Sequence, residues 1–227
     1  MKIGLGITTF NRPEHKKMCY ESAFNTADNI LIYIAEDTNN DRRGIAYRKN
    51  ECLKALKDCD YIFLVDDDIV FLKKEWERFF IEESKASEQQ HLLYLKDTSS
   101  IKLIKATFFP PANTCIEQYS NCGGCFVFVT KEVIEKVGAF DERFGKYGWE
   151  HANYSKRIHM AGLTPMGEYL CPEKAGEYIY AMDYDNYLPF NKQVNHRPSL
   201  PAKEGLAEIN KGVEHWKKPI TEFFISL

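Results

Sequence analysis

The sequence predicts a single α/β domain with a mostly parallel central sheet flanked by helices. In the first third of the chain, short apolar runs rich in β-forming residues alternate with segments of helical periodicity, which is the pattern of a parallel sheet. The length of 227 residues corresponds to one large domain at about 150 residues per domain. Hydrophobic residues make up 44% and charged residues 28%, as in ordinary soluble proteins, so we expect a packed core.

The first two strands are predicted over residues 3–9 and 30–35. A helix is expected between them, because Pro13 suits a first helical turn. Asp37 follows the second strand. Apolar residues at helical spacing predict a second helix ahead of residues 61–65, whose uninterrupted Tyr-Ile-Phe-Leu-Val sequence is typical of a strand buried on both faces.

The second half of the chain is expected to add elements in a less regular order. A helix is predicted over residues 73–85, and a shorter helix over 131–137 is closed by Gly138 as a left-handed cap. A last helix is expected to end at Gly162. Apolar runs predict three further strands, over residues 92–95, 101–108 and 125–130.

The charge balance excludes some classes of partner. The net charge of -3 gives no general attraction to nucleic acid or to anionic lipid, so we expect no nucleic-acid partner. We find neither a signal-peptide pattern nor an apolar stretch of about 20 residues, and therefore expect no transmembrane segment and a soluble, cytoplasmic protein.

The seven cysteines are odd in number and too sparse for a small disulfide scaffold, which favours a reducing compartment. Cys122 and Cys125 have the spacing of a redox pair or of half a zinc site. They precede a predicted strand rather than opening a helix, and no second pair with this spacing exists. We therefore assign this pair neither role.

Three adjacent aspartates follow the third predicted strand, namely Asp66, Asp67 and Asp68. Like charges this close raise one another's pKa, and a divalent cation relieves that cost. Carboxylates suit Mg²⁺ or Mn²⁺, which commonly keep one or two protein carboxylates while substrate phosphates complete the shell. Alternation along an extended segment is expected to turn Asp66 and Asp68 to one side and Asp67 away. Asp37 occupies the matching place after the second predicted strand, and open α/β sheets bind ligands at the carboxyl ends of their strands.

Several short motifs stand out along the chain in a fixed order. The first half carries Thr8-Thr9-Phe10-Asn11-Arg12-Pro13, Glu36-Asp37, Arg48-Lys49-Asn50 and the three aspartates. The second half carries Gly123-Gly124-Cys125-Phe126-Val127-Phe128, Val137-Gly138-Ala139-Phe140-Asp141-Glu142-Arg143-Phe144 and Tyr147-Gly148-Trp149-Glu150-His151. Together, over about residues 3–162, they resemble the GT-A fold glycosyltransferases. The last motif resembles the Gly-Trp-Glu-Asp signature of the large inverting group that includes chitin and chondroitin synthases.

This resemblance implies a GT-A, Rossmann-like fold. It also implies metal-dependent transfer of a sugar from a nucleoside diphosphate donor, a UDP-sugar above all, to a hydroxyl acceptor such as a glycan, with inversion. The glycosyltransferase domain would cover residues 1–200, with a nucleotide-binding part over about 1–110 and an acceptor part over about 111–200. Residues 201–227 would form a helical extension, whose role as a cap or as a docking surface stays open. The oligomeric state also stays open.

The resemblance further implies roles for individual residues. The nucleotide-sugar would be contacted by Thr8, Phe10, Arg12, Asp37, Arg48, Asn50, Asp66, Asp67, Gly123, Gly124 and Trp149. The metal cofactor, Mn²⁺ or Mg²⁺, would be held by Asp66 and Asp68, with His196 as a candidate third ligand. The two glycines have no Cβ and so allow a close approach of the backbone to the donor sugar.

Glu150 and His151 are the candidate catalytic residues. The family keeps Glu-Asp here, and its second acid commonly takes the proton from the acceptor hydroxyl. In this chain that position is His151, whose ordinary pKa of about 6.5 also suits proton abstraction. The base is therefore Glu150 or His151, unless the enzyme is retaining and needs no such base.

Two other functions remain open from the sequence. The first is an inactive nucleotide-sugar or glycan-binding module, which is possible because His151 replaces the acid that the family keeps at this position. The second is a nucleotidyltransferase, which also uses a metal and acids at a strand end. A nucleotidyltransferase would carry a glycine-rich basic loop near the N-terminus, and Gly4-Leu5-Gly6 is followed by no such basic residues.

Overall fold

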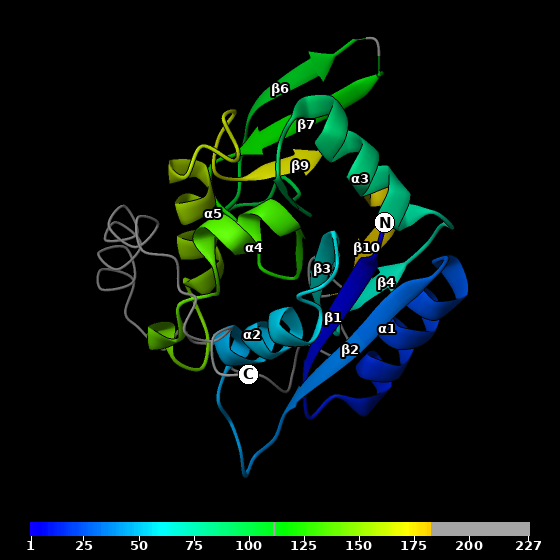
Figure 1. The fold of residues 1–227 in the computed structure, drawn as a ribbon, viewed down its shortest axis with the longest axis vertical. Helices are drawn as coiled ribbons and strands as arrows, with labels where there is room; N and C mark the ends of the chain where they lie inside the picture. The colour runs from blue at the N-terminus through cyan, green and yellow to red at the C-terminus, as the bar shows by residue number, and fades with distance from the viewer. Residues whose placement is uncertain (111, 183–227) are drawn as a thin grey trace.

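The computed structural model describes residues 1–110 and 112–182. Its centre is a five-stranded sheet with the order β2-β1-β3-β8-β5 (Figure 1). The strands are β1 (Ile3–Phe10), β2 (Ile30–Asp37), β3 (Tyr61–Asp66), β5 (His91–Leu93) and β8 (Phe126–Thr130). β1 is parallel to β2 and β3, whereas β8 is antiparallel to both β3 and β5. Four of the five strands therefore run in one direction, which confirms the predicted mostly parallel sheet.

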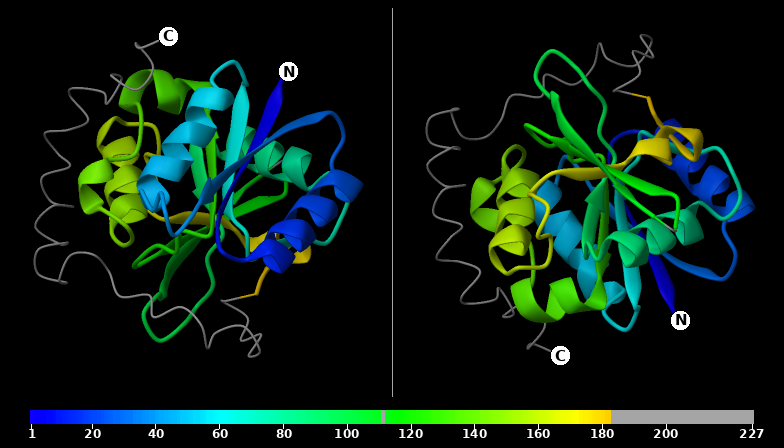
Figure 2. Two further views of the ribbon diagram at one scale, coloured as in Figure 1. Left: turned by 90° about the horizontal axis from the view of Figure 1, so that it is seen from below. Right: turned by 90° about the horizontal axis from the view of Figure 1, so that it is seen from above.

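Helices lie on both sides of the central sheet (Figure 2). They are α1 (Pro13–Thr26), α2 (Ile45–Ala55), α3 (Trp76–Ser87), α4 (Lys131–Val137) and α5 (Glu150–Met160), with short 3-10 turns η1 (Glu142–Phe144) and η2 (Glu173–Glu177). Two small sheets complete the described part: β4 (Ile69–Phe71) pairs with β10 (Ile179–Ala181), and β7 (Thr114–Tyr119) lies between β6 (Leu103–Phe109) and β9 (Leu170–Pro172). Among the described residues, no helix combines the length and the apolar character needed to cross a membrane.

The structure moves some predicted boundaries. The helix predicted over 73–85 begins at Trp76, because Glu75 adopts a left-handed conformation with a φ of 61°. The strand predicted over 101–108 is β6, which lies outside the central sheet in a hairpin at one end of the molecule (Figure 1). Gly138 follows α4 with a φ of 81°, which favours glycine, but its ψ of -141° differs from that of the predicted left-handed cap.

Tight packing of α2 on β1 explains the N-terminal glycines. A Cβ on Gly6 would collide with the side chain of Cys52 on α2, and a Cβ on Gly4 would lie only 3.0 Å from Cys59 Sγ. Both glycines lie inside β1, so the Gly4-Leu5-Gly6 segment serves packing and does not form a phosphate loop. This close contact fixes α2 directly beside the strand ends that form the site.

The buried core includes a histidine, His91, on β5. Its Nδ1 donates to Phe128 O at 2.9 Å, and its Nε2 accepts from Ser155 Oγ at 2.8 Å, as a neutral ring allows. Burial lowers the pKa of His91 from 6.5 to about 4. Between these two pH values, the unfolded chain binds a proton at this position and the folded chain does not, so stability falls as the pH falls.

We therefore expect the free energy of unfolding to decrease by about 3 kcal/mol between pH 7 and pH 4 on account of His91 alone. Urea titrations of the wild type and of His91→Gln at pH 7, 5.5 and 4 measure this contribution. The difference in unfolding free energy between the two proteins is expected to shrink as the pH falls. A difference that stays constant over this range would contradict the neutral, buried state of His91.

Candidate active site

A cavity of about 790 Å³ lies at the carboxyl ends of β1, β2 and β3. This is the edge where open α/β sheets bind ligands. Its wall joins these strand ends to residues 98–101, 121–125 and 146–152, the last of which include the start of α5. Most of the predicted site residues line it, namely Thr8, Phe10, Arg12, Asp37, Arg48, Asp66, Asp68, Gly123, Gly124, Trp149, Glu150 and His151.

Two of the predicted residues, Asn50 and Asp67, do not line the cavity. The carboxylate of Asp67 turns away from it, as the alternation predicted, and accepts hydrogen bonds from Arg12 and from Thr9 Oγ1. This internal pairing argues against the direct nucleotide contact expected for Asp67. The third predicted metal ligand, His196, and the extension over 201–227 lie outside the described residues.

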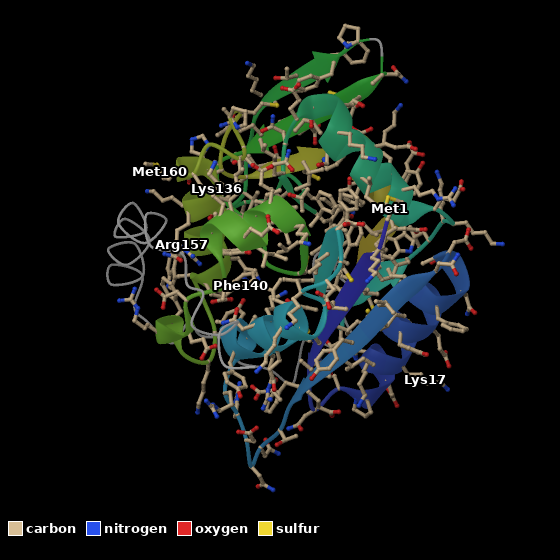
Figure 3. All side chains as sticks on the ribbon, in the orientation of Figure 1. Met1, Lys17, Lys136, Phe140, Arg157 and Met160 are labelled. Atoms are coloured by element: carbon tan, nitrogen blue, oxygen red, sulfur yellow. The ribbon has the colours of Figure 1, made fainter. Side chains whose placement is uncertain are left out.

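Asn50 is fully buried on α2 and holds a segment of the second half. Its Nδ2 donates to Phe140 O at 3.0 Å and to Glu142 Oε1 at 2.8 Å, and its Oδ1 accepts from Phe140 N at 2.8 Å. Phe140 lies on the side of the molecule formed by α4 and α5, near the buried Arg157, as Figure 3 shows. Asn50 therefore fixes this segment beside α2. Its position argues against the predicted contact between Asn50 and the nucleotide.

Asp66 is anchored by a lysine that the sequence analysis did not select. Lys49 Nζ lies 2.9 Å from Asp66 Oδ1 and donates to Gly124 O at 3.1 Å, and its side chain is fully buried. Thr8 Oγ1 donates to the same Asp66 oxygen at 2.8 Å. Burial acts to raise the pKa of Asp66, but the Lys49 cation and the nearby His151 outweigh it and hold that pKa below its ordinary value. Asp66 is thus kept as a carboxylate at the cavity wall.

Asp66 and Asp68 suit a divalent cation whose coordination shell is completed by the substrate. Asp66 and Asp68 both line the cavity, while Asp67 points elsewhere. Two carboxylates are the number that Mg²⁺ or Mn²⁺ commonly takes from a protein when phosphates and waters supply the other ligands. Within residues 1–110 and 112–182, no group of three or more His, Cys, Asp or Glu side chains is arranged so that it could hold a metal ion. A metal at this position would therefore need ligands from the substrate or from water in addition to the two aspartates.

Basic and aromatic residues line the cavity around the loop after β2. The Arg42 guanidinium lies 4.2 Å from the centre of the Phe10 ring. Both carboxylate oxygens of Asp37 accept backbone hydrogen bonds, from Arg43 at 2.8 Å and from Gly44 at 3.1 Å, and Arg48 Nε approaches within 3.1 Å. Asp37 and Arg48 therefore shape this loop as well as line the cavity.

Arg42 and Lys146 also line the cavity and were not predicted. Lys146 follows a turn whose backbone is tied to α2, since Ile45 N donates to Lys146 O at 3.2 Å. With Arg12, which also lines the cavity, these side chains place positive charge in the same cavity as Asp66 and Asp68. Nothing in the spacing of Arg42 or Lys146 marks them in the sequence, because their contribution depends on how the two loops meet.

The segment before α5 has an unusual backbone. Gly148 and Trp149 have φ values of 102° and 75°, and Trp149 is the residue immediately before Glu150 at the start of α5. A left-handed conformation of a bulky residue costs about 1–3 kcal/mol and occurs mainly where function requires it. This bend turns Trp149, Glu150 and His151 into the cavity wall.

All seven cysteines are free thiols. Cys122 and Cys125 line the cavity, and burial raises the pKa of both thiols above the ordinary value. Because a thiolate is the reactive form, this environment disfavours thiol chemistry.

The sheet order, the acids at the end of β3 and the glycine and Trp-Glu-His segments that face them define a GT-A fold. No model of a protein family matches the chain. An uncharacterized glycosyltransferase of Acanthamoeba polyphaga mimivirus is 29% identical over 156 residues, which make up 67% of this chain and 57% of that protein. The chain thus spans little more than half the length of this curated relative.

Solved glycosyltransferases share the fold. S. aureus TarS aligns over 100% of this chain and 46% of its own, with a TM-score of 0.57 and 12% identity. A Drosophila β1,4-galactosyltransferase 7 variant in complex with manganese, UDP-Gal and xylobiose aligns over 89% of this chain and 78% of its own, with a TM-score of 0.51 and 16% identity. A mannosyltransferase of Pyrobaculum calidifontis in complex with GDP-Man and Mn²⁺ aligns over 75% of this chain and 56% of its own, with a TM-score of 0.51 and 12% identity.

Proposed function

We propose that this protein is a metal-dependent glycosyltransferase that moves a sugar from a nucleoside diphosphate donor to a hydroxyl acceptor. The observation that carries the proposal is the meeting of Asp66 and Asp68 with Glu150 and His151 around one cavity of about 790 Å³. These residues come from opposite halves of the chain, and a cavity of this size suits a nucleotide-sugar. The similar structures with bound UDP-Gal or GDP-Man and manganese support this class of donor.

The donor end of the cavity is assigned to the first half of the chain. Asp66 and Asp68 would hold Mn²⁺ or Mg²⁺, which neutralises charge on the departing diphosphate when it is bound. Arg12, Arg42 and Lys146 supply positive charge at the same wall for the phosphates. Phe10 offers an apolar ring to the base, and we propose uracil as that base because the family resemblance favours it.

The acceptor end is assigned to the segment 147–151 and the loop 121–125. The indole ring of Trp149 offers an apolar surface on which one face of a sugar can pack. Glu150 and His151 supply a proton acceptor beside the cavity, which direct displacement by a hydroxyl requires. For this reason we propose a glycan acceptor and inversion at the anomeric carbon.

Calorimetric titration tests the donor assignment. The protein is titrated with UDP, GDP and their common sugar conjugates, once with Mn²⁺ and once with EDTA, and release of the nucleoside diphosphate is then measured for each conjugate that binds. We expect metal-dependent binding of one conjugate and its slow hydrolysis. Absence of binding to every nucleotide would refute the proposal. Tight binding with no turnover would identify a binding module instead, and turnover of a nucleoside triphosphate with pyrophosphate release would identify a nucleotidyltransferase.

A further inference from the structure

Two buried polar atoms in the cavity wall lack a hydrogen-bond partner within the described residues. They are Glu150 Oε2 and His151 Nε2, on side chains whose residues are 2% and 7% exposed. Buried polar atoms in folded proteins are nearly always paired, so an exception beside a cavity indicates a group that is kept for a ligand. The other polar atoms of the same two side chains contact each other, since His151 Nδ1 lies 2.9 Å from Glu150 Oε1.

This contact determines which nitrogen of His151 carries the proton. An ionised carboxylate only accepts hydrogen bonds, so Nδ1 must donate to Glu150. In the neutral ring the proton is then on Nδ1, and Nε2 keeps its lone pair. His151 therefore presents a proton acceptor, and Glu150 selects the tautomer that makes it one.

We propose that His151 is the catalytic base of the transfer and that Glu150 is its positioning residue. The inference rests on the proposed glycosyltransferase function and resolves which of the two residues takes the proton. His151 Nε2 takes the proton of the acceptor hydroxyl as the hydroxyl oxygen bonds to the anomeric carbon. The bond from that carbon to the diphosphate oxygen breaks, and its electron pair leaves with the nucleoside diphosphate. The imidazolium that forms is stabilised by the Glu150 carboxylate beside it.

The surroundings of His151 hold the ring in one place. A Cβ on Gly124 would collide with Nδ1, Cε1 and Cγ of His151, so only glycine leaves room for the ring there. Phe140 packs against the ring nearly edge-on, at 5.6 Å between centroids and 75° between planes. Gly124 O in turn accepts from Lys49 Nζ, which also contacts Asp66. The position of the base is thus coupled to the strand-end acid through one lysine.

A spectroscopic measurement tests the tautomer without any substrate. In ¹⁵N-histidine-labelled protein at neutral pH, we expect the His151 resonances, assigned by comparison with His151→Asp, to show a protonated Nδ1 and an unprotonated Nε2. Glu150→Ala is expected to shift the population toward the Nε2-protonated tautomer, which is the more common one for a free ring. A wild-type His151 protonated on Nε2 would overturn the proposal.

Kinetics then test the role in turnover, with hydrolysis of whichever nucleotide-sugar binds as the reaction and nucleoside diphosphate release as the readout. His151→Ala is expected to lower kcat by about 10²–10⁴-fold, while the calorimetric Kd of the donor changes less than about twofold. Glu150→Gln keeps an oxygen that can accept from His151 Nδ1–H, so its kcat is expected to fall less than that of Glu150→Ala. Unchanged kcat in His151→Ala, with the donor still bound, would overturn the base assignment and leave the proposed function intact. Failure of the wild type to bind any donor would instead defeat the proposed function.

The pH profile separates a base from a merely structural histidine. Within the described residues, the charged and titratable groups that interact with His151 include Glu150 on its own helix, Asp66 at the end of β3 and His91 on β5. His151→Asp restores the Glu-Asp pair of the family, and the rise of kcat on the acidic side of its pH profile is expected at lower pH than in the wild type, because a carboxyl ionises at lower pH than an imidazole. An identical limb in both proteins would contradict proton transfer to His151.

A glycine pair provides a structural control. Gly124→Ala is expected to displace the His151 ring and to lower kcat at least 10-fold, because the new methyl group occupies the space of the ring. Gly176→Ala, whose Cβ would meet Tyr94 Oη at an ordinary 3.7 Å, is expected to leave kcat unchanged. Equal kcat values for the two variants would show that Gly124 does not seat the base.

Discussion

Replacing Asp68 with asparagine is expected to abolish the Mn²⁺-dependent part of donor binding. Asp68 lines the cavity beside Asp66, and the neutral amide removes one of the two carboxylates available to the metal there. Without the metal, no divalent cation lies between the diphosphate of the donor and the Asp66 carboxylate, and the two negative groups repel each other. The Kd for the donor, measured by calorimetry with Mn²⁺ and with EDTA, is expected to become the same in both buffers for Asp68→Asn.

The adjacent residue supplies a matched control for this experiment. Asp67→Asn removes the same charge one position away, but its side chain contacts Arg12 and Thr9 and does not line the cavity. It is therefore expected to keep a Kd that depends on Mn²⁺, even if the protein is less stable. Metal dependence that survives in Asp68→Asn and disappears in Asp67→Asn would reverse the assignment of the two side chains.

The sequence sufficed to predict the elements whose residues form a strong local pattern. Residues 61–65 are continuously apolar, and the structure buries them in β3, so the aspartates that follow had to emerge at the edge of the sheet. Asp67 also turns away from the cavity as predicted, although residues 67 and 68 form a turn after β3 rather than the extended segment on which that prediction was based. For β3 the determining physics lies within a few residues, and a sequence shows it directly.

The roles of Arg48, Lys49 and Asn50 depend on tertiary contacts and were only partly predictable. These three consecutive polar residues are all buried, at 7%, 0% and 0% exposure, because α2 lies between the central sheet and the segment that precedes α5. Successive helix residues point in directions about 100° apart. Arg48 therefore meets the loop after β2, Lys49 meets Asp66 and Gly124, and Asn50 meets Phe140. No pattern in the sequence distinguishes these partners from solvent.

Gly124 gives a second example of the same limit. The family resemblance assigned its lack of a side chain to the donor sugar, whereas in the structure the vacant space is filled by the His151 ring. The two residues are far apart in the chain, and only the pairing of β8 with β3 and the position of α5 bring them together. A glycine in a sequence shows that space is needed, but the neighbour that needs it is a property of the fold.

Lys49→Met is expected to lower the free energy of unfolding by about 3 kcal/mol. The lysine side chain is 0% exposed and that of Asp66 is 21% exposed, so loss of the cation leaves a largely buried carboxylate with Thr8 as its remaining side-chain donor within residues 1–110 and 112–182. The methionine fills the space of the lysine stem, so the effect arises from charge and not from a cavity. Urea unfolding at pH 7 and low salt measures the change.

A double-mutant cycle isolates the pair from other effects of the substitution. If Lys49 and Asp66 stabilise the fold through each other, Lys49→Met combined with Asp66→Asn is expected to be more stable than the sum of the two single changes allows. Additive losses would show that Lys49 acts through packing or through Gly124 alone.

Lys73→Met serves as a surface control, since Lys73 and Glu177 form an exposed pair at 2.7 Å, and its urea midpoint is expected to stay at the wild-type value. Suppose that only Lys49→Met causes a large loss of unfolding free energy. Lys49 would then both stabilise Asp66 and hold Gly124 beside His151, the proposed base. The donor end and the acceptor end of the site would then depend on a single buried charge.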